Sequence, residues 1–501
     1  MMTFRRASRD LGLLIVSAVI LAGLTVERPM PAAEIDALAG GGALIDAVFD
    51  PDQPADTRLR SGFRVDPDHP RASNFKKRRS WRRQYIDAPL PRWTAGIAIL
   101  LAPGDLSDHH AAHALACLVM VLTAFAAMAL VGGGAAGAAA ALATLASSAA
   151  LDAAAGAGAG AIGAAAMMAF LFSTQRMLTR EGGAIPIGIS WGLLLACHPG
   201  ALFLLVPLFV AVAIAWRTNS IPSPGRYDTA TTLPLPAIPL TLLAVPIVGL
   251  IVLIALWPTL WADTGRGLGQ WLTDTWWAVA PTQAALGQAY HPPSARAPQA
   301  FLAPIQWLVW TPWPLLVAWL AGLITTVRAG RAGLWSPILV LASTLVIGGI
   351  DGGLFGARRS LMPWLWVCTA LTAGVGLAHL GRRVGPAVAG LCVLWALMAQ
   401  PWGITSAGPE AQLSTPTAQL RHIAEAQPHA RVHIASKNAG QRYGVETLAW
   451  RADLQVQWAK PDAAQWVIAL GEAEKSGAWW SEREPEWRGQ IAGVEARRYR
   501  R

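Results

Sequence analysis

Two aspartates separated by a single proline stand in a polar segment close to the amino terminus of the chain. Asp50 and Asp52 belong to a Phe-Asp-Pro-Asp run, and a second Asp-Pro-Asp run begins at Asp66. A carboxylate in such a segment can act as a general base that takes the proton of an attacking hydroxyl or amine. Asp and Pro also initiate turns, and turn chemistry is the simpler explanation of both runs taken alone. Asp50 and Asp52 are the favoured candidates for this base, and Asp36 and Asp66 are the alternatives.

A third aspartate, Asp152, is the only charged residue in the Gly- and Ala-rich segment 131–163. An isolated carboxylate at or near a membrane boundary is costly, so it is a candidate for function. Asp also suits the first turn of a helix, where it caps free N–H groups. The two interpretations are compatible, and Asp152 is retained as a candidate catalytic residue.

The elements that must position these residues are apolar and long. The 501-residue chain is 54% hydrophobic and only 14% charged, which indicates an integral membrane protein. A helix that crosses a membrane needs about 20 apolar residues. About eleven spans are expected on this basis: 11–26, 109–131, 135–150, 153–175, 184–197, 201–216, 236–257, 304–327, 336–349, 361–379 and 386–398.

Positive charge in the short connections predicts the orientation of these spans. Arginine pairs at 176 and 180, 217 and 226, 328 and 331, and 382 and 383 fall on the same side as the basic amino terminus, which should be cytoplasmic. The loop 27–108, the turn at Asp152, the loop 258–303, the turn 351–359 and the tail after residue 400 then face outward. We expect a multi-pass protein of the inner or plasma membrane with an exported carboxyl terminus.

The first exported loop and the tail have their own organisation. The run 93–104 is too short to span and predicts an interfacial helix, and the basic run 76–83 either binds anionic lipid headgroups or is a solvated face. In the tail, 432–435, 454–458 and 466–470 read as strands and 441–452 as a helix. The expected fold is an α-helical polytopic membrane domain over 1–400, with interfacial helices in 27–108, followed by a small exported α/β domain over 401–501.

Several short motifs follow one another along the chain in a fixed order. They are Phe49-Asp-Pro-Asp52, the run from Tyr85 to Trp93 that contains Asp87 and Arg92, Ser148-Ala-Ala-Leu-Asp152, the run from Gly192 to Gly200 that contains His198, Leu256 to Asp263, His291 to Pro314, and Arg359-Ser-Leu-Met-Pro363. This order resembles that of the multi-spanning glycosyltransferases that use polyprenyl-phosphate sugars, which include protein O-mannosyltransferases and the aminoarabinose transferase of lipid A. The resemblance covers most of the chain.

The resemblance implies roles for particular residues. Asp50 and Asp52 stand where the family has an Asp-Glu pair, Asp152 matches its second exported aspartate, and His198 replaces its more usual lysine. It implies catalytic roles for these three aspartates and substrate binding for Asp87, Arg92, His198, His291, Arg358 and Arg359. Because the Asp-Glu pair is absent, the resemblance does not single out one of the loop aspartates as the base, and a non-catalytic protein is the alternative.

The chemistry of sugar transfer asks for the same residue types. A carboxylate takes the acceptor proton as the anomeric carbon develops positive charge, and cations stabilise the departing lipid phosphate. Arginine suits that phosphate because its contacts are bidentate. The expected partners are a polyprenyl-phosphate-sugar donor, a lipid, glycan or protein acceptor, and membrane lipids, with no nucleic acid. A transporter, a non-catalytic scaffold and a lipid-linked polysaccharide ligase or polymerase remain as alternatives.

No metal ligands are assigned from the sequence, and a divalent metal ion is left open as a cofactor. His109, His110 and His113 include an i, i+4 pair that could hold a metal on one helix face. Capping of a helix at the membrane surface explains them better.

Overall fold

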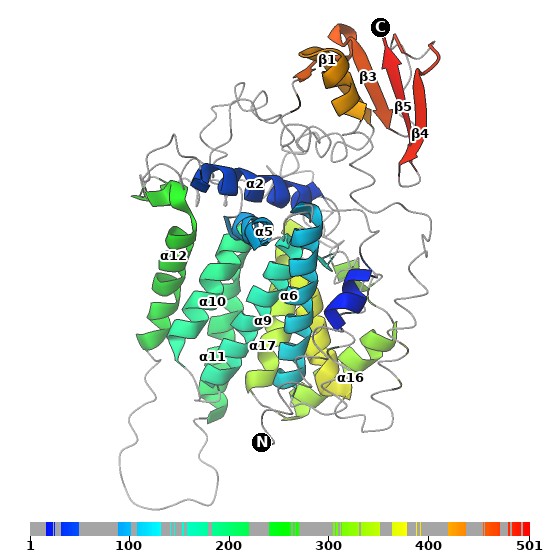
Figure 1. Cartoon of the computed structure of the whole chain (residues 1–501). Coiled ribbons are helices and arrows are strands. Elements are labelled where there is room, and N and C mark those ends of the chain that lie inside the picture. Colours follow the sequence, from blue (N-terminus) through cyan, green and yellow to red (C-terminus); the bar gives the residue numbers. More distant parts are fainter. Residues whose placement is uncertain are drawn as a thin grey trace, which may run out of the picture.

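A computed structural model of the chain describes most of the helices and strands that the sequence predicts. The described residues are 17–23, 25, 32–49, 89–101, 108–131, 141, 145, 153–154, 158–178, 183–219, 240–261, 264–265, 267–269, 304–305, 307–308, 311, 313–329, 332–350, 363–377, 387, 391, 419–436, 454, 456–470, 479–480, 483–491 and 494–501. They form a helical bundle followed by a carboxyl-terminal sheet (Figure 1).

The bundle is built from apolar helices that lie alongside one another. Its α-helices are α6 (Asp108–Leu130), α9 (Ala159–Leu178), α10 (Ala184–Cys197), α11 (Leu205–Asn219), α12 (Ala244–Leu256), α16 (Trp313–Ala329) and α17 (Ala332–Ile350), joined by the helix Pro363–Leu377. Short 3-10 helices η2 (Pro199–Leu204), η3 (Leu240–Leu243) and η4 (Pro258–Trp261) flank α11 and α12. α10 and α12 contain no charged residue, as expected for helices in an apolar environment.

Two further helices close one end of the bundle. α2 (Ala32–Phe49) lies across this end, and α5 (Pro89–Leu101) lies beneath it (Figure 1). The two backbones approach so closely that a Cβ on Gly41 would lie 2.6 Å from the backbone nitrogen of Gly96. Leu38 of α2, Ala98 of α5 and Ala112 of α6 form a small buried cluster, which ties both helices to the start of α6. We call this the α2 end of the bundle.

The seam between α10 and α12 shows how small residues set the helix spacing. A Cβ on Gly192 would lie 2.6 Å from the carbonyl oxygen of Gly249, so these helices pack backbone against backbone. Gly188 faces Val245 and Val248, whereas Gly192 faces Gly249 and Val252, so the two helices run in the same direction.

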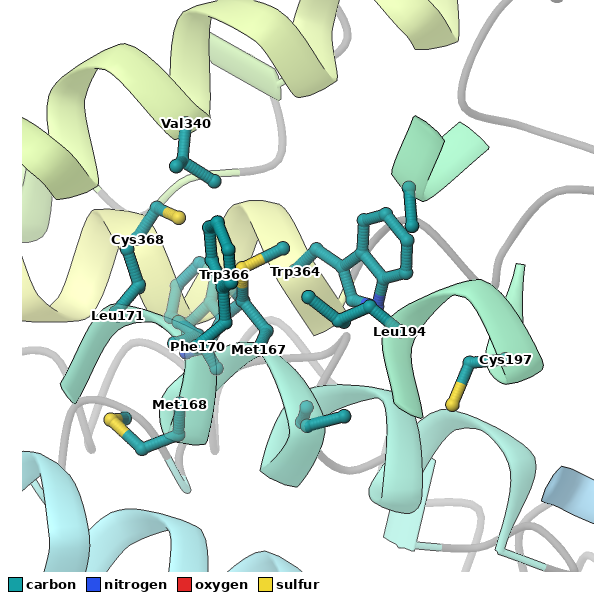
Figure 2. Close-up of a cluster of buried hydrophobic side chains, with 14 of the residues drawn as sticks. Met167, Met168, Phe170, Leu171, Leu194, Cys197, Val340, Trp364, Trp366 and Cys368 are labelled. Carbon is teal, nitrogen blue, oxygen red and sulfur yellow. The ribbon is translucent and has the colours of Figure 1, made fainter. Parts of the chain in front are cut away.

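The core of the bundle is a continuous cluster of apolar side chains. Figure 2 shows Met167, Met168, Phe170 and Leu171 of α9 beside Leu194 and Cys197 of α10, Val340 of α17, and Trp364, Trp366 and Cys368 of the helix Pro363–Leu377. Trp364 is fully buried among them. These side chains join the middle of α9 and of α17 to the end of α10 before His198 and to the start of the helix Pro363–Leu377.

The outer surface of the bundle is also apolar. Ile247 and Ile251 of α12 are 60% and 59% exposed, and Val206 of α11 is 62% exposed. Within the described residues, His110–Leu130 and Gly160–Leu178 are long and apolar enough to cross a membrane, and several shorter apolar helices accompany them. The mostly helical class is confirmed, whereas the count of eleven spans stays a prediction.

The start of α9 differs from the expected span 153–175. The helix begins at Ala159, directly after Gly158, whose φ of +105° lies in the left-handed region. Glycine adopts that conformation without steric cost, so α9 can begin directly after Gly158. The segment 135–150 and the span 386–398 lie almost wholly outside the described residues.

The carboxyl-terminal region contains a five-stranded mixed sheet in the order β2-β1-β3-β5-β4. Its strands are β1 (Ala430–Ser436), β2 (Val456–Trp458), β3 (Trp466–Leu470), β4 (Trp487–Ile491) and β5 (Val494–Arg500). β1 pairs in parallel with β2 and β3, and β5 pairs antiparallel with β3 and β4. A helix over 419–426 contributes Leu420 and Ile423 to one face of the sheet. The three predicted strands are confirmed, and the predicted helix 441–452 lies outside the described residues.

Candidate functional site

Arg92 lies on α5 at the α2 end of the bundle. Its side chain crosses the surface of α2 at Gly40, where an added Cβ would lie 2.8 Å from Nε. Glycine at position 40 therefore leaves room for the guanidinium between the two helices. Next to it, the indole N–H of Trp93 donates to the carbonyl oxygen of Leu256, 2.8 Å away. This bond attaches α5 to the last residue of α12.

His198 lies at the junction of α10 and η2. Its backbone is extended, with φ of −159°, and its Nδ1 accepts a hydrogen bond from the backbone N–H of Gly200 at 2.9 Å. A side chain that accepts from the second residue of the following helix is an N-cap. The imidazole also stands edge-on to Trp364, with ring centroids 5.8 Å apart and an interplanar angle of 84°. Position 198 is therefore fixed from two directions.

Arg92 and His198 lie at the same end of the bundle. α10 and α12 run in the same direction, so the carboxyl end of α10, where His198 stands, lies level with the carboxyl end of α12. That end of α12 is the one bound by Trp93. The contact between His198 and Trp364 brings the start of the helix Pro363–Leu377 to the same level.

The chain next to Asp152 also packs near this end. Ala153 and Ala154 are buried, and the carbonyl oxygen of Ala154 accepts a hydrogen bond from Sγ of Cys117 on α6 at 3.6 Å. A Cβ on Gly158 would lie 3.0 Å from the methyl group of Thr94 on α5. Ala154 therefore contacts α6, and Gly158 contacts α5.

A buried polar cluster connects the first apolar segment to α6. The hydroxyl of Thr25 lies 2.8 Å from Nε2 of His113 and 3.7 Å from Sγ of Cys117, and it also donates to the carbonyl oxygen of Leu21. Thr25 and His113 are both buried. Because polar groups in an apolar interior need partners, these contacts fix the two helices in register where the chain enters the first loop.

The remaining candidates lie outside the described residues: Asp50, Asp52, Asp87, Asp152, His291, Arg358 and Arg359. The neighbouring described residues are informative. α2 ends at Phe49, the residue before Asp50, and α5 begins at Pro89, two residues after Asp87. Trp364, which contacts His198, follows Arg359 by five residues.

Three contacts at this site were not foreseen from the sequence. They are the ring contact of Trp364 with His198, the bond from Trp93 to Leu256 and the pairing of Thr25 with His113. Trp93 is half of the basic-aromatic pair Arg92-Trp93, which signals an interfacial position. Trp364 gave no signal of its own, because a tryptophan at the start of a span is ordinary.

Within the described part of the chain, no group of three or more His, Cys, Asp and Glu side chains is placed to hold a metal ion. His113 of the histidine cluster is engaged by Thr25. The described groups at the α2 end supply a guanidinium and an imidazole. Such groups stabilise an anion, and a carboxylate base would have to come from the adjoining segments.

No family model matches the chain, and no curated protein is similar to it in sequence. Among solved structures, ArnT from Cupriavidus metallidurans in the apo state is similar over 98% of both chains, with a TM-score of 0.56 and 12% identity. The archaeal oligosaccharyltransferase AglB from Archaeoglobus fulgidus, in complex with an inhibitory peptide and a dolichol-phosphate, has a TM-score of 0.48 and 12% identity over 93% of this chain and 69% of its own.

A second structure of the Archaeoglobus fulgidus oligosaccharyltransferase, in complex with Zn and sulfate, has a TM-score of 0.48 and 13% identity over 91% of this chain and 67% of its own. The resemblance inferred from the sequence is confirmed at the level of fold by the likeness to ArnT, an aminoarabinose transferase.

Proposed function

We propose that the chain is an integral membrane glycosyltransferase that moves a sugar from a polyprenyl-phosphate donor to an acceptor on the outer face of the inner or plasma membrane. One observation carries the proposal. The described elements that carry or border the candidate residues meet at the α2 end of a bundle whose fold matches ArnT over 98% of both chains. Fold alone does not determine activity, so the site carries the argument.

The outer surface of the bundle supports a location in the membrane. Large apolar side chains such as Ile247, Ile251 and Val206 are exposed on α12 and α11. In water, large contiguous apolar patches are rare on a monomer. Hydroxyl groups inside the bundle, including those of Thr344, Thr369 and Thr372, donate to carbonyl oxygens four residues earlier in their own helix. This arrangement satisfies polar groups where no water is available.

The loop aspartates would supply the base. In the proposed reaction, Asp50 takes the proton of the acceptor hydroxyl or amine, with Asp52 as the alternative base. The acceptor atom forms a bond to the anomeric carbon as the bond from that carbon to the phosphate oxygen breaks. The polyprenyl phosphate leaves with the electron pair. Asp152 would position the acceptor or share a metal ion with the donor phosphate.

Arginine and histidine side chains around the α2 end would stabilise the departing phosphate. Arg92 reaches the surface of α2, and His198 is held at the end of α10. We propose that Arg359, with Arg358, joins them, because the chain continues from Arg359 to Trp364 at the ring of His198. Bidentate contacts make arginine the better ligand for a lipid phosphate than lysine. Asp87 and His291 remain proposed substrate-binding residues on the sequence resemblance.

The test is transfer of radiolabelled sugar from a panel of polyprenyl-phosphate donors by purified protein in lipid nanodiscs. Asp50→Asn, Asp52→Asn and Asp152→Asn are compared with the wild type, with and without a divalent-metal chelator. Loss of a general base lowers turnover by about 10²–10⁴-fold, so one loop variant should lose nearly all transfer. Glu425→Gln is the matched control, because Glu425 is exposed on the helix 419–426.

The outcomes separate the proposal from its alternatives. Loss of transfer in one loop variant, with the melting temperature and the Glu425→Gln activity unchanged, supports the enzyme and identifies its base. Absence of transfer by the wild type over the whole panel, together with no binding of polyprenyl phosphate, contradicts the proposal and favours a scaffold or a transporter.

A further inference from the structure

Four arginines and two tryptophans gather at one end of the carboxyl-terminal sheet. Trp466, at the start of β3, lies with Arg498 and Arg500 of β5 on the face that packs against the helix 419–426, whereas Trp479, which follows β3, packs against the opposite face. The group consists of Trp466, Trp479, Arg483, Arg498, Arg500 and Arg501. We call this group the arginine–tryptophan surface. It plays no part in the proposed transfer site, which lies at the α2 end of the bundle.

Each tryptophan ring is in contact with two guanidinium groups. The Cζ atoms of Arg498 and Arg500 lie 5.6 Å and 5.0 Å from the ring centroid of Trp466. Those of Arg483 and Arg501 lie 5.4 Å and 6.0 Å from that of Trp479. At these distances a cation is attracted by the negative face of the ring.

The rings themselves are fixed by hydrogen bonds. The indole N–H of Trp466 donates to Oε1 of Gln427 at 3.2 Å, and that of Trp479 donates to the carbonyl oxygen of Pro461 at 3.0 Å. The two stacks are joined because Nη1 of Arg483 donates to the carbonyl oxygen of Arg500 at 2.9 Å. Arg483 is therefore fixed to the end of β5 as well as to the ring of Trp479.

Within the described part of the sheet, no acidic side chain forms an ion pair with Arg483, Arg500 or Arg501. Among the described residues of the sheet, the ion pair joins Arg498 to Glu486 at 3.9 Å, whereas Arg483 and Arg501 donate to carbonyl oxygens, the latter to that of Asp462. Arg483, Arg500 and Arg501 are exposed. Arg483 and Arg501 share the ring of Trp479, so an anion bound between these two guanidiniums would relieve the repulsion of their like charges.

The arrangement fits phosphate better than other anions. A guanidinium stacked on a ring face keeps its N–H groups in its own plane, where they can reach a ligand. The two oxygens of a carboxylate are satisfied by one arginine, but the oxygens of a phosphate can be shared between two or three. Several adjacent arginines therefore suit a ligand with more than one phosphate.

The position of the surface indicates where such a ligand comes from. In Figure 1 the carboxyl terminus of β5 lies at the end of the sheet that points away from α2 and the bundle. With the α2 end at the membrane surface, the headgroups of the same bilayer lie on the opposite side of the sheet. A ligand that approaches from solution, such as an extended glycan, reaches the surface directly.

We propose that the arginine–tryptophan surface binds the phosphate groups of an extended, phosphate-bearing acceptor glycan. This inference rests on the proposed function, since it names the chemistry of the acceptor for the transferase. The surface would hold a distal part of the acceptor while its reactive end reaches the α2 end of the bundle. A short acceptor without phosphates would not use it.

The test measures binding of inorganic polyphosphate by the full-length protein in nanodiscs of phosphatidylcholine. The double variant Arg483→Gln/Arg501→Gln should weaken binding at least about tenfold, since two charge-assisted contacts are lost. Trp479→Leu should weaken it as well, because its two arginines lose their platform. Arg421→Gln is the matched control: Arg421 is exposed on the helix 419–426 and contacts neither ring.

Equal polyphosphate binding by the wild type and the double variant, with all melting temperatures unchanged, overturns the inference. Binding to phosphatidylglycerol vesicles but not to polyphosphate also overturns it, and identifies a membrane partner instead. The proposed function can fail separately. If the wild type binds polyphosphate through these arginines but transfers no sugar, phosphate binding by the surface is supported and the transferase activity is contradicted.

Discussion

The helical bundle and the carboxyl-terminal sheet differ in the polarity of their exposed residues. On α12 the exposed positions Ile247 and Ile251 are as apolar as the buried ones, whereas exposed positions near β5 are arginines. A sheet that contacts water on its rim presents charge there, and a bundle in hydrocarbon has no reason to do so. The difference is the one expected if the bundle folds in hydrocarbon, as proposed, and the sheet folds in water.

They also differ in how they hold polar groups. In the bundle, hydroxyls such as that of Thr369 donate to their own helix, and indoles such as that of Trp191 donate to nearby backbone carbonyls. In the sheet, side chains reach across strands: Arg498 donates to Gln419 at 2.7 Å and stacks on Trp466. Side-chain bonds between distant residues therefore occur in both regions, as Trp93 and Leu256 show in the bundle, but the close backbone packing is a feature of the bundle.

The largest effect is expected from a charge on the outer face of the bundle. Ile251 is 59% exposed near the middle of α12. In a water-soluble bundle, Ile251→Arg would be nearly neutral, but in hydrocarbon it costs about 3 kcal/mol. We expect reduced membrane insertion and a lower melting temperature in nanodiscs. Gln457→Arg, at an exposed position of β2, is the control and should leave both unchanged.

If Ile251→Arg leaves membrane insertion and melting temperature unchanged, the contrast between the bundle and the sheet is wrong. Such a result would mean that α12 faces water or another protein surface, and that the bundle and the sheet share one solvent. Measuring insertion by carbonate extraction separates this outcome from simple unfolding.

A smaller effect is expected from a seam glycine. A Cβ on Gly322 of α16 would overlap the carbonyl oxygen of Thr372 on the helix Pro363–Leu377. Because the obstacle is backbone, it cannot move aside as a side chain would, and Gly322→Ala should destabilise by about 1–3 kcal/mol. Thermal unfolding in nanodiscs measures the loss. The same change at Gly23, which has nothing within 4 Å of an added Cβ, should stay within about 1 kcal/mol.

If Gly322→Ala and Gly23→Ala behave alike, close backbone packing does not control the stability of the bundle. The bundle and the sheet would then differ only in the solvent that their exposed residues contact.

The sequence predicted the helical class and the first three strands because each rests on a local pattern. β1 and β3 are short apolar runs, and they are apolar because both lie inside the sheet. β4 and β5 were missed, since Trp487–Ile491 and Val494–Arg500 contain few apolar residues. In β5, Arg498 and Arg500 replace the expected alternation because they cover Trp466, a contact visible only after β3 and β5 pair.

For the candidate site, the sequence predicted on which side of the membrane residues lie but not which side chains they contact. Counting spans placed Arg92 and His198 on one face, and the structure brings both to the α2 end. The ring contact between His198 and Trp364 joins residues 166 positions apart in the sequence, so no local pattern reveals it. Gly40 likewise leaves space for Arg92 only because α2 packs on α5.

The smallest effect is expected from the ion pair in the sheet. Glu486 and Arg498 are 3.9 Å apart, with side chains 41% and 12% exposed. In Glu486→Gln, Arg498 keeps its bond to Gln419 and its stack on Trp466, so the loss should stay below about 1 kcal/mol. Thermal unfolding at low and high salt measures it. A loss larger than that of Gln419→Ala would show that the sheet is held by paired charges. Hydrogen bonds to uncharged partners and ring contacts would then not be enough to explain the stability of the sheet. Arg483, Arg500 and Arg501, for which no acidic partner is described, would then need a bound anion to balance their charge.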